Sequence, residues 1–220
     1  MENLTSNEAI MDLRWNFLFK PFEELLVNKT ILEIAPYDGW FRRNFLNLPP
    51  KELHVVELNP SAINVLRGPK FSEDIDKDLF TVHDADIHLK LYEFAPKQFE
   101  VIICSGFLYH TPHVLWITEG IARLKPEYVF IETFGDEFGF LPEDVNGPGM
   151  RQSDHKCVPV NLAIPKLMQI DWFKSLGYEI LQEVDTSHAD LSLDIKSDDP
   201  ARNYFNLWKK EYGIWFKRVD

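Results

Sequence analysis

The chain has 220 residues, of which 45% are hydrophobic, so it is long enough to bury one sizeable core and too short to suggest two full domains. Its 35 acidic side chains outnumber 23 Lys and Arg, and the net charge of -12 disfavours nucleic acid as a partner, because neutralising phosphates requires a basic surface. No apolar run approaches the roughly 20 residues of a membrane helix and the N-terminus lacks a secretory pattern, so we expect a cytoplasmic protein without a membrane segment.

The first predicted element is a helix that Ser6 or Asn7 can cap and that the first proline of the chain interrupts. A helix placed before the first strand can cover an edge of the sheet or close over a ligand. We therefore expect residues 1–28 to form an N-terminal helical cap. Within it, Arg14 and Trp15 are of interest for ligand contacts, although core packing is the better explanation for Trp15.

The chain is organised around residues 30–40, T-I-L-E-I-A-P-Y-D-G-W. Ile31, Leu32 and Ile34 are bulky and apolar, which is typical of a parallel strand that is covered on both faces. Turn-forming residues at 35–39 end this strand, and aromatic side chains at helical spacing follow it. This order of strand, loop and helix predicts a site for a phosphate or a nucleoside.

An acidic residue follows at the distance that such a site requires. Residues 54–60, H-V-V-E-L-N-P, form a β-branched run that ends in Glu57, and an acid at this place binds ribose hydroxyls in nucleoside sites. The glycine fingerprint is incomplete, because Gly39 is present but Ala35 and Tyr37 stand where the first two glycines would be. Without those glycines a pyrophosphate cannot approach the backbone closely. A nicotinamide dehydrogenase is therefore disfavoured, whereas a ligand with a ribose and no phosphate remains possible.

The third strand, residues 80–82, leads into the polar tetrad H-D-A-D at 83–86. Open α/β sheets place their ligand contacts at the carboxyl ends of the strands. Asp84 or Asp86 is therefore a candidate contact for the base of a nucleoside. Either aspartate could instead cap the helix predicted at 87–93, and the two roles are compatible.

The most apolar strand is predicted at 99–104, F-E-V-I-I-C, and should be central in the sheet. Its exit, residues 105–113, reads S-G-F-L-Y-H-T-P-H and concentrates Gly, Tyr and two His. The two cysteines of the chain, Cys104 and Cys157, have neither a disulfide pattern nor metal-ligand spacing. We expect reduced thiols and no metal site.

The second half of the chain continues with a helix at 114–124 and a strand at 128–133. Residues 134–163 then break the rhythm with repeated Gly and Pro, and so long a stretch is more often a functional loop than a spacer. We expect an inserted loop there, which either closes as a lid over bound ligands or packs permanently on the sheet edge.

The last elements are a helix at 164–176 and strands at 179–184 and 212–217, separated by a polar, acidic segment without a clear crossover helix. Two strands joined in this way predict an antiparallel last strand. Strands that alternate with helices predict a doubly wound parallel sheet. The chain, residues 1–220, is therefore expected to be a single α/β domain that is Rossmann-like, with a mainly parallel seven-stranded sheet and a reversed last strand.

The order of motifs ILEIAPYDGWF, HVVELNP, HDADIH, FEVIICSGFLYH and YVFIETF resembles that of the class I S-adenosylmethionine-dependent methyltransferases. The resemblance covers residues 30–133 and implies S-adenosyl-L-methionine as the cofactor. More narrowly, SGFLYHTPHVLW followed by VFIET is similar to the bacterial enzymes that carboxymethylate the wobble uridine of transfer RNA, and to small relatives that share their G-x-L-Y-H segment.

The resemblance also implies which residues contact each part of the cofactor. Glu33 and the loop 35–39 would line the methionine part, Glu57 would bind the ribose, and the positions after the third and fourth strands would meet the adenine and the sulfonium. The implied cofactor contacts are Glu33, Ala35, Tyr37, Asp38, Gly39, Glu57, Asp84, Ala85, Ser105 and Gly106. The sequence departs from the family pattern in the loop, where Ala35-Pro36-Tyr37 replaces glycine-any-glycine.

Methyl transfer is an in-line displacement, and holding the nucleophile in line can account for roughly 7–11 kcal/mol of the barrier. A base is needed only when the acceptor must lose a proton. His110 and His113 are the candidates, with Tyr109 to orient the acceptor. His110 could instead pack or cap, and His113 could lie in an exposed first helical turn. His155, in the long loop, is a further candidate for the acceptor pocket.

We expect a small-molecule acceptor, because the charge repels a polyanion and the chain lacks a basic or aromatic-stacking module for RNA. One alternative is a transfer-RNA-modifying methyltransferase or carboxymethyltransferase. Another is a non-catalytic nucleoside-binding or regulatory module, which the irregular glycine loop favours. The sequence does not indicate an oligomeric state.

Overall fold

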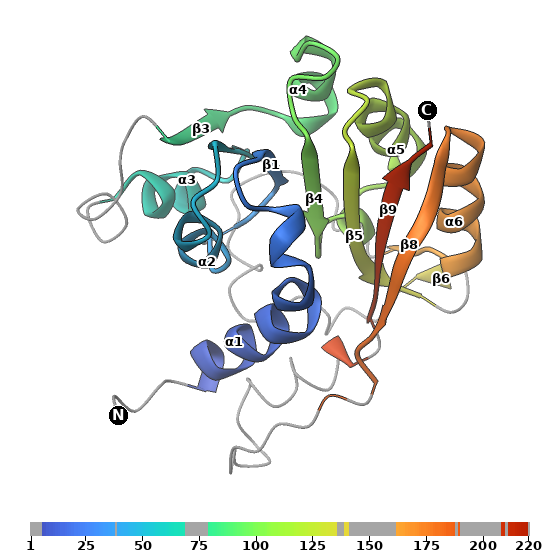
Figure 1. Ribbon diagram of the computed structural model, residues 1–220, viewed down its shortest axis with the longest axis horizontal. Helices are drawn as coiled ribbons and strands as arrows, with labels where there is room; N and C mark the ends of the chain where they lie inside the picture. The colour runs from blue at the N-terminus through green and yellow to red at the C-terminus, as the bar shows by residue number, and fades with distance from the viewer. Residues whose placement is uncertain are drawn as a thin grey trace.

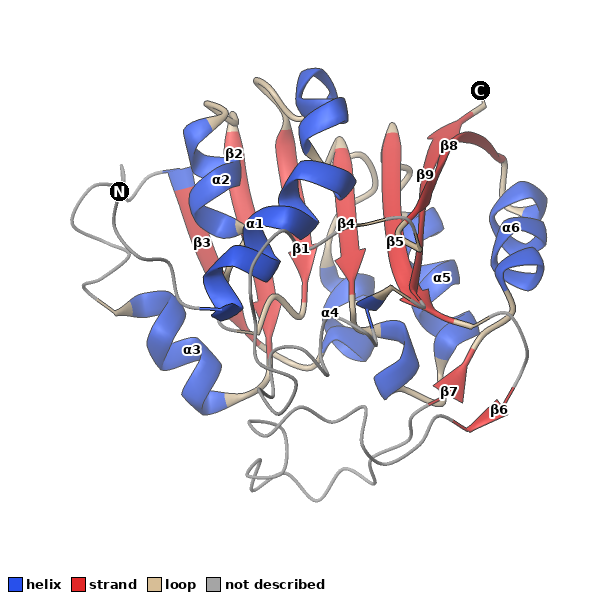
Figure 2. Ribbon diagram, turned by 90° about the horizontal axis from the view of Figure 1, so that it is seen from below, coloured by secondary structure: helices blue, strands red, loops and turns tan. Residues whose placement is uncertain are grey.

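The computed structural model describes residues 6–37, 39–68, 79–135, 139–140, 162–187, 189, 208–209 and 211–219. Its main feature is a seven-stranded sheet with the strand order β3-β2-β1-β4-β5-β9-β8 (Figure 2). The strands of this sheet are β1 (Thr30–Ile34), β2 (Glu52–Glu57), β3 (Phe80–Asp84), β4 (Val101–Ser105), β5 (Tyr128–Phe134), β8 (Tyr178–Asp185) and β9 (Glu211–Arg218). A separate antiparallel pair consists of β6 (Gly139–Phe140) and β7 (Leu162–Ala163).

Helices cover both faces of the sheet (Figure 1). Their bounds are α1 (Ser6–Leu18), α2 (Arg42–Asn47), α3 (Pro60–Arg67), α4 (Ile87–Glu93), α5 (Val114–Arg123) and α6 (Lys166–Ser175), with short 3-10 helices η1 (Lys20–Leu25) and η4 (Leu108–His110). None of the described helices is long and apolar enough to cross a membrane.

Strands β1 to β5 pair in parallel, and β9 pairs antiparallel with both β5 and β8. The predicted α/β fold with a mainly parallel seven-stranded sheet and a reversed last strand is therefore confirmed. The reversed strand β9 lies between β5 and β8, so the last strand of the sequence is not an edge strand.

The strand that begins the organising stretch is buried on both faces, as its apolar composition predicts. Leu32 and Ile34 belong to a core shared with α4, α5 and α6, whereas Ile31 belongs to a second core shared with α1 and α2. Trp15 packs in this second core and is 7% exposed, which confirms that it is a core residue. These two cores set the positions of the strand ends that form the candidate site.

Two elements differ from the predicted ones, and one predicted segment lies mostly outside the described residues. The central strand begins at Val101 rather than at residue 99, although Glu100 already bonds to Thr30, through its amide at 2.9 Å and through its carboxylate at 3.1 Å. The exit of this strand contains the one-turn helix η4, which is too short to produce a helical pattern in the sequence. Most of residues 134–163, with His155 and Cys157, lies outside the described residues, although β6 and β7 form a small antiparallel pair near its ends.

Candidate functional site

The candidate site lies at the carboxyl edge of the parallel strands. Because β1 to β5 run in the same direction, the loops that follow them meet at this edge. The register places Glu57 of β2 beside Asp84 of β3, and Ser105 of β4 beside Glu132 of β5. Glu57 and Asp84, which were predicted from separate motifs, are thus neighbours in space.

The loop after β1 adopts a backbone that glycine would favour, although two of its residues are not glycine. Ala35 has a φ of 50°, Tyr37 of 55° and Gly39 of 73°. All three lie in the left-handed region, which costs an L-residue roughly 1–2 kcal/mol. The backbone of this loop is therefore left-handed, as in a glycine loop, and the loop differs from a glycine loop in the side chains of Ala35 and Tyr37. Asp38 lies outside the described residues.

The Glu57 carboxylate fastens this loop to the end of β2. Its Oε1 accepts hydrogen bonds from the amides of Leu58 and Asn59, both at 2.8 Å, and its Oε2 accepts one from the amide of Tyr37 at 3.0 Å. Glu57 is 7% exposed. Three backbone donors thus hold a buried carboxylate at the loop that the resemblance assigns to the cofactor, in a fixed orientation.

Behind this loop, Glu33 and Arg42 form a buried charged layer. Glu33 is 3% exposed and Arg42 is 2% exposed. Burial lowers the pKa of the Arg42 guanidinium to about 10, and the charge of Glu33 opposes this shift. Arg42 also donates to the carbonyl oxygen of Leu66, at 2.5 Å, and stacks over Phe80 at 3.9 Å from the ring centroid. Glu33 is therefore close enough for its charge to act on the Arg42 guanidinium, which joins α2 to α3.

The segment after β3 lies next to Glu57. The amide of Ala85 donates to the carbonyl oxygen of Glu57 at 3.1 Å. Asp84 is exposed and lies 3.7 Å from the guanidinium of Arg67. Asp86 caps α4 through a 2.9 Å hydrogen bond from the amide of His88, so the helix-capping role belongs to Asp86 rather than to Asp84.

The end of β4 meets the N-terminal helix at a buried ion pair. Nη2 of Arg14 lies 2.5 Å from Oε2 of Glu132, and it also donates to Oγ of Ser105 at 3.3 Å. The Ser105 hydroxyl donates to the same carboxylate oxygen, and the amide of Gly106 donates to the Glu132 carbonyl at 3.0 Å. Arg14 thus joins α1 to the point where the sulfonium is expected.

Two further side chains complete this charged cluster. Nε1 of Trp208 donates to Oε1 of Glu132 at 2.8 Å, and Oε2 of Glu211 lies 3.9 Å from Nη2 of Arg14. Burial, followed by repulsion from the Glu132 carboxylate, raises the pKa of Glu211 well above its ordinary value, and Arg14 only partly opposes this. The cluster therefore combines one ion pair with a carboxyl group that tends to keep its proton.

The predicted catalytic residues follow Gly106 but do not converge on one point. Tyr109 is buried, and its hydroxyl lies 3.3 Å from where a Cβ on Gly106 would be. His110 is half-buried with its ring centroid 4.2 Å from that of Tyr109. His113 is exposed and lies immediately before α5, and its ring is 5.5 Å from that of His88. Tyr109 is therefore the one of the three whose side chain is shown to reach Gly106.

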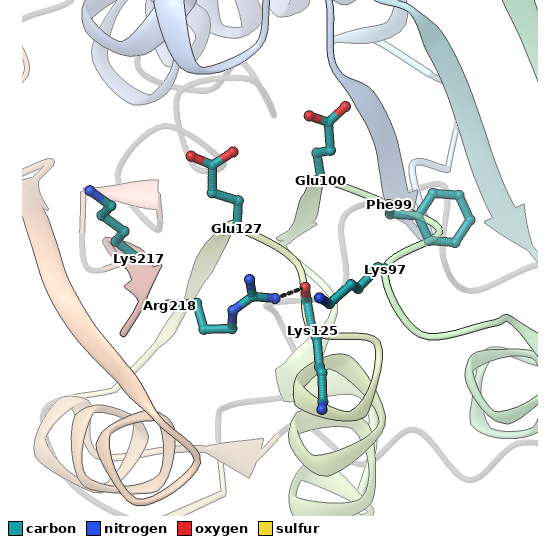
Figure 3. A pocket seen from close by; sticks show the side chains of 7 residues that line it. All are labelled: Lys97, Phe99, Glu100, Lys125, Glu127, Lys217 and Arg218. Atoms are coloured by element: carbon teal, nitrogen blue, oxygen red, sulfur yellow. Dashed lines mark hydrogen bonds between the residues drawn. The ribbon is translucent and has the colours of Figure 1, made fainter. Parts of the chain in front are cut away.

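The opposite edge of the sheet contains a pocket of different character, shown in Figure 3. It lies before β4 and β5 and at the end of β9, and it is lined by Lys97, Phe99, Glu100, Lys125, Glu127, Lys217 and Arg218. Both of its carboxylates are ion-paired with Lys29, at 3.0 and 2.8 Å. None of the predicted site residues lines it. Among the described residues, no three His, Cys, Asp or Glu side chains form a group that could hold a metal ion.

Sequence reasoning missed Glu132, Glu211, His88 and Thr111 as members of the site. A charged residue inside the apolar run V-F-I-E-T-F was the available signal for Glu132, because a buried charge requires a partner. His88 and Thr111 gave no comparable signal, since each lies in an ordinary helix or loop pattern.

The chain was compared with known proteins. No family model matches it. The tRNA U34 carboxymethyltransferase of Nautilia profundicola is 29% identical over 115 residues, which are 52% of this chain and 36% of that protein. The matched region therefore spans little more than a third of that relative's length.

Solved structures match a larger part of the chain at lower identity. An S-adenosylmethionine-dependent methyltransferase from Mesorhizobium loti is 13% identical with a TM-score of 0.62, and the match covers 94% of this chain and 100% of that one. Magnesium protoporphyrin IX methyltransferase from Synechocystis PCC 6803, with bound S-adenosylhomocysteine, is 9% identical with a TM-score of 0.62, and the match covers 97% and 84%. These similarities confirm, at the level of the fold, the resemblance to S-adenosylmethionine-dependent methyltransferases.

Proposed function

We propose that this chain is an S-adenosylmethionine-dependent methyltransferase that acts on a small-molecule acceptor. The observation that carries the proposal is the loop after β1, which is left-handed at Ala35, Tyr37 and Gly39 and is bonded to the Glu57 carboxylate through the amide of Tyr37. This is the backbone that a glycine loop would have, formed at the expected place despite a different sequence. A strained backbone of this kind persists where the surrounding structure enforces it, as at ligand sites.

The cofactor, when bound, supplies a methyl group that its sulfonium has already activated. Glu57 would bind the ribose hydroxyls with a carboxylate that backbone amides already orient. The segment of Asp84 and Ala85 lies beside it for the adenine, and Ser105 and Gly106 lie at the end of the neighbouring β4 for the sulfonium. Binding and in-line positioning are therefore the main contributions of these residues.

The acceptor side favours transfer of an uncharged methyl group. Arg14 is already ion-paired with Glu132 at 2.5 Å, and Glu211, whose raised pKa favours the protonated form, adds no cation to the cluster. A carboxymethyl group would bring a further carboxylate to this buried cluster without a cation to pair with it, and a buried unpaired charge is costly. The carboxymethyltransferase alternative therefore comes second. The hydroxyl of Tyr109 is the group that could orient the acceptor.

Binding of the cofactor and release of the methyl group can be tested separately. Calorimetry should show S-adenosylmethionine binding to the wild-type chain, and Glu57→Ala should weaken it at least about tenfold, since a charge-assisted hydrogen bond contributes roughly 1.5–3 kcal/mol. Glu93→Ala is the matched control, because it removes an exposed carboxylate of α4 far from the loop. Equal affinities of the two variants would place the ribose elsewhere.

Methyl release from labelled cofactor, measured with a panel of small molecules and with transfer RNA, identifies the acceptor class. Salt-sensitive transfer-RNA binding with methylation of the RNA would refute the small-molecule assignment. Cofactor binding without methyl release to any acceptor would instead support a non-catalytic nucleoside-binding module.

A further inference from the structure

A chain of hydrogen bonds connects the segment after β3 to the segment after β4. Oδ1 of Asp86 lies 2.7 Å from Nδ1 of His88, and Nε2 of His88 lies 2.8 Å from Oγ1 of Thr111. The Thr111 hydroxyl oxygen in turn accepts the amide of His113 at 3.0 Å. The imidazole of His88 thus uses both of its nitrogens to bridge two loops at the same edge of the sheet.

The Asp86 carboxylate fixes one side of this bridge. Burial acts to raise the pKa of Asp86, but the hydrogen bonds from the backbone and side chain of His88 outweigh it and lower that pKa. Asp86 is therefore an acceptor and Nδ1 of His88 is its donor, while Nε2 of His88 pairs with the hydroxyl of Thr111. The Thr111 oxygen also accepts the amide of His113, so the hydroxyl contacts both the ring of His88 and the backbone before α5.

The chain of bonds is protected from water where it meets the acceptor segment. Thr111 is 2% exposed, so its hydroxyl has little access to solvent as an alternative partner. A second bridge runs in parallel, because Nε1 of Trp116 in α5 donates to the carbonyl oxygen of His88 at 2.9 Å. The first turn of α4 and the start of α5 are therefore fixed relative to each other through His88.

The two ends of this series of hydrogen bonds lie at different parts of the proposed site. Asp86 follows Asp84 and Ala85, the segment assigned to the adenine. Thr111 directly follows Tyr109 and His110, the segment assigned to the acceptor. Ordering of the first segment by a ligand would restrict His88, and through it the backbone at Thr111.

We propose that His88 and Thr111 are positioning residues that couple cofactor binding beside β3 to the ordering of the acceptor segment after β4. This inference rests on the proposed function, because it requires that the chain bind the cofactor. Neither residue contacts the reacting atoms. Each acts through the backbone of the segment that carries Tyr109 and His110.

Hydrogen exchange with and without S-adenosylhomocysteine tests the coupling without any acceptor. In the wild-type chain, the ligand should slow exchange about tenfold or more in both segments, residues 84–88 and 106–113. Thr111→Val removes the hydroxyl at nearly constant volume, and His88→Ala removes the bridge at a partly exposed helix position. In both variants we expect slowing at 84–88 and a change of less than about threefold at 106–113. Thr111→Ser keeps the hydroxyl and should restore the wild-type pattern.

The outcomes separate the coupling from a merely structural role. If the two residues were only a structural tether, Thr111→Val and His88→Ala would lower the melting temperature, but the ligand would still slow hydrogen exchange at 106–113 as in the wild type. This result would overturn the proposal. Absence of S-adenosylhomocysteine binding by the wild-type chain in calorimetry would overturn the proposed function and the coupling with it. Ligand binding by all four proteins with slowing at 106–113 only in the wild type and Thr111→Ser supports the coupling.

Discussion

Ala35→Gly should stabilise the protein relative to a matched alanine-to-glycine change elsewhere. Ala35 has a φ of 50°, and the left-handed region costs an L-residue roughly 1–2 kcal/mol. Glycine removes that cost, but it also destabilises the folded state by about 0.4–1 kcal/mol, because it increases the conformational entropy of the unfolded chain. Ala122 is the control, because its methyl group packs against the same core as that of Ala35 but its backbone is in helix α5.

The difference between the two variants isolates the backbone contribution, since each loses one partly buried methyl group. Glycine within a helix costs about 1 kcal/mol relative to alanine. We therefore expect Ala35→Gly to be more stable than Ala122→Gly by roughly 1–2.6 kcal/mol, which corresponds to about 2–10 °C in melting temperature for a chain of this size.

Urea and thermal unfolding of both variants measure this difference, and calorimetry with S-adenosylhomocysteine measures its effect on the site. Ala35→Gly should bind at least as tightly as the wild type, because it keeps the left-handed backbone and removes a side chain from the loop. Equal destabilisation by Ala35→Gly and Ala122→Gly would show that the loop is not strained at Ala35, and the main argument for a preserved cofactor loop would be lost.

Three further substitutions probe the edge of the sheet. Gly39→Ala should lower the free energy of unfolding in urea by about 1–3 kcal/mol. Gly39 has a φ of 73°, and the Cβ of the introduced alanine would lie 2.6 Å from Cδ2 of Leu66. An unchanged midpoint would contradict this. Glu132→Gln should lower the free energy of unfolding by about 3–5 kcal/mol, because it leaves Arg14 buried without its carboxylate. Adding Arg14→Met to this variant should restore part of that stability. Strictly additive effects of the two substitutions would argue against the pairing. Because its raised pKa makes the folded state bind the Glu211 proton more tightly, the contribution of Glu211 to stability should fall as pH rises above 4.5, and the melting temperature of the wild type minus that of Glu211→Gln should fall over the same range. Parallel pH profiles would refute that assignment.

Most of the fold could be predicted because its signals are local. A strand buried on both faces, such as residues 31–34, needs an almost continuous apolar run, and a helix needs apolar residues at its own period. The reversal of β9 followed from the lack of a crossover helix before it. The order of strands in the sheet is not a local property, and the composition of the chain predicted only that the strand at residues 99–104 is central, as β4 is.

The convergence of the proposed cofactor residues was predictable for a related reason. Glu57 and Asp84 are the last residues of neighbouring parallel strands, whose carboxyl ends share one edge, so placing them on strand ends already places them side by side. The backbone conformation at Ala35 and Tyr37 was not predictable from propensity, since neither residue favours the left-handed region. The tertiary structure overrides local preference there, through the amide of Tyr37 that is bonded to Glu57.

The acceptor side depends on pairings between residues far apart in the sequence, which local patterns do not reveal. Glu132 is one such residue, and its burial still predicts that it has hydrogen-bond donors. Burying an unpaired carboxylate in the centre of a sheet costs several kcal/mol, so a glutamate within V-F-I-E-T-F requires donors from other elements. Because Glu132 lies near the carboxyl end of β5, those donors must come from neighbouring strand ends or from the element that covers this edge. Ser105 and Arg14 meet this requirement, which links the N-terminal helix to the chemistry of the site through electrostatics rather than through its own sequence pattern.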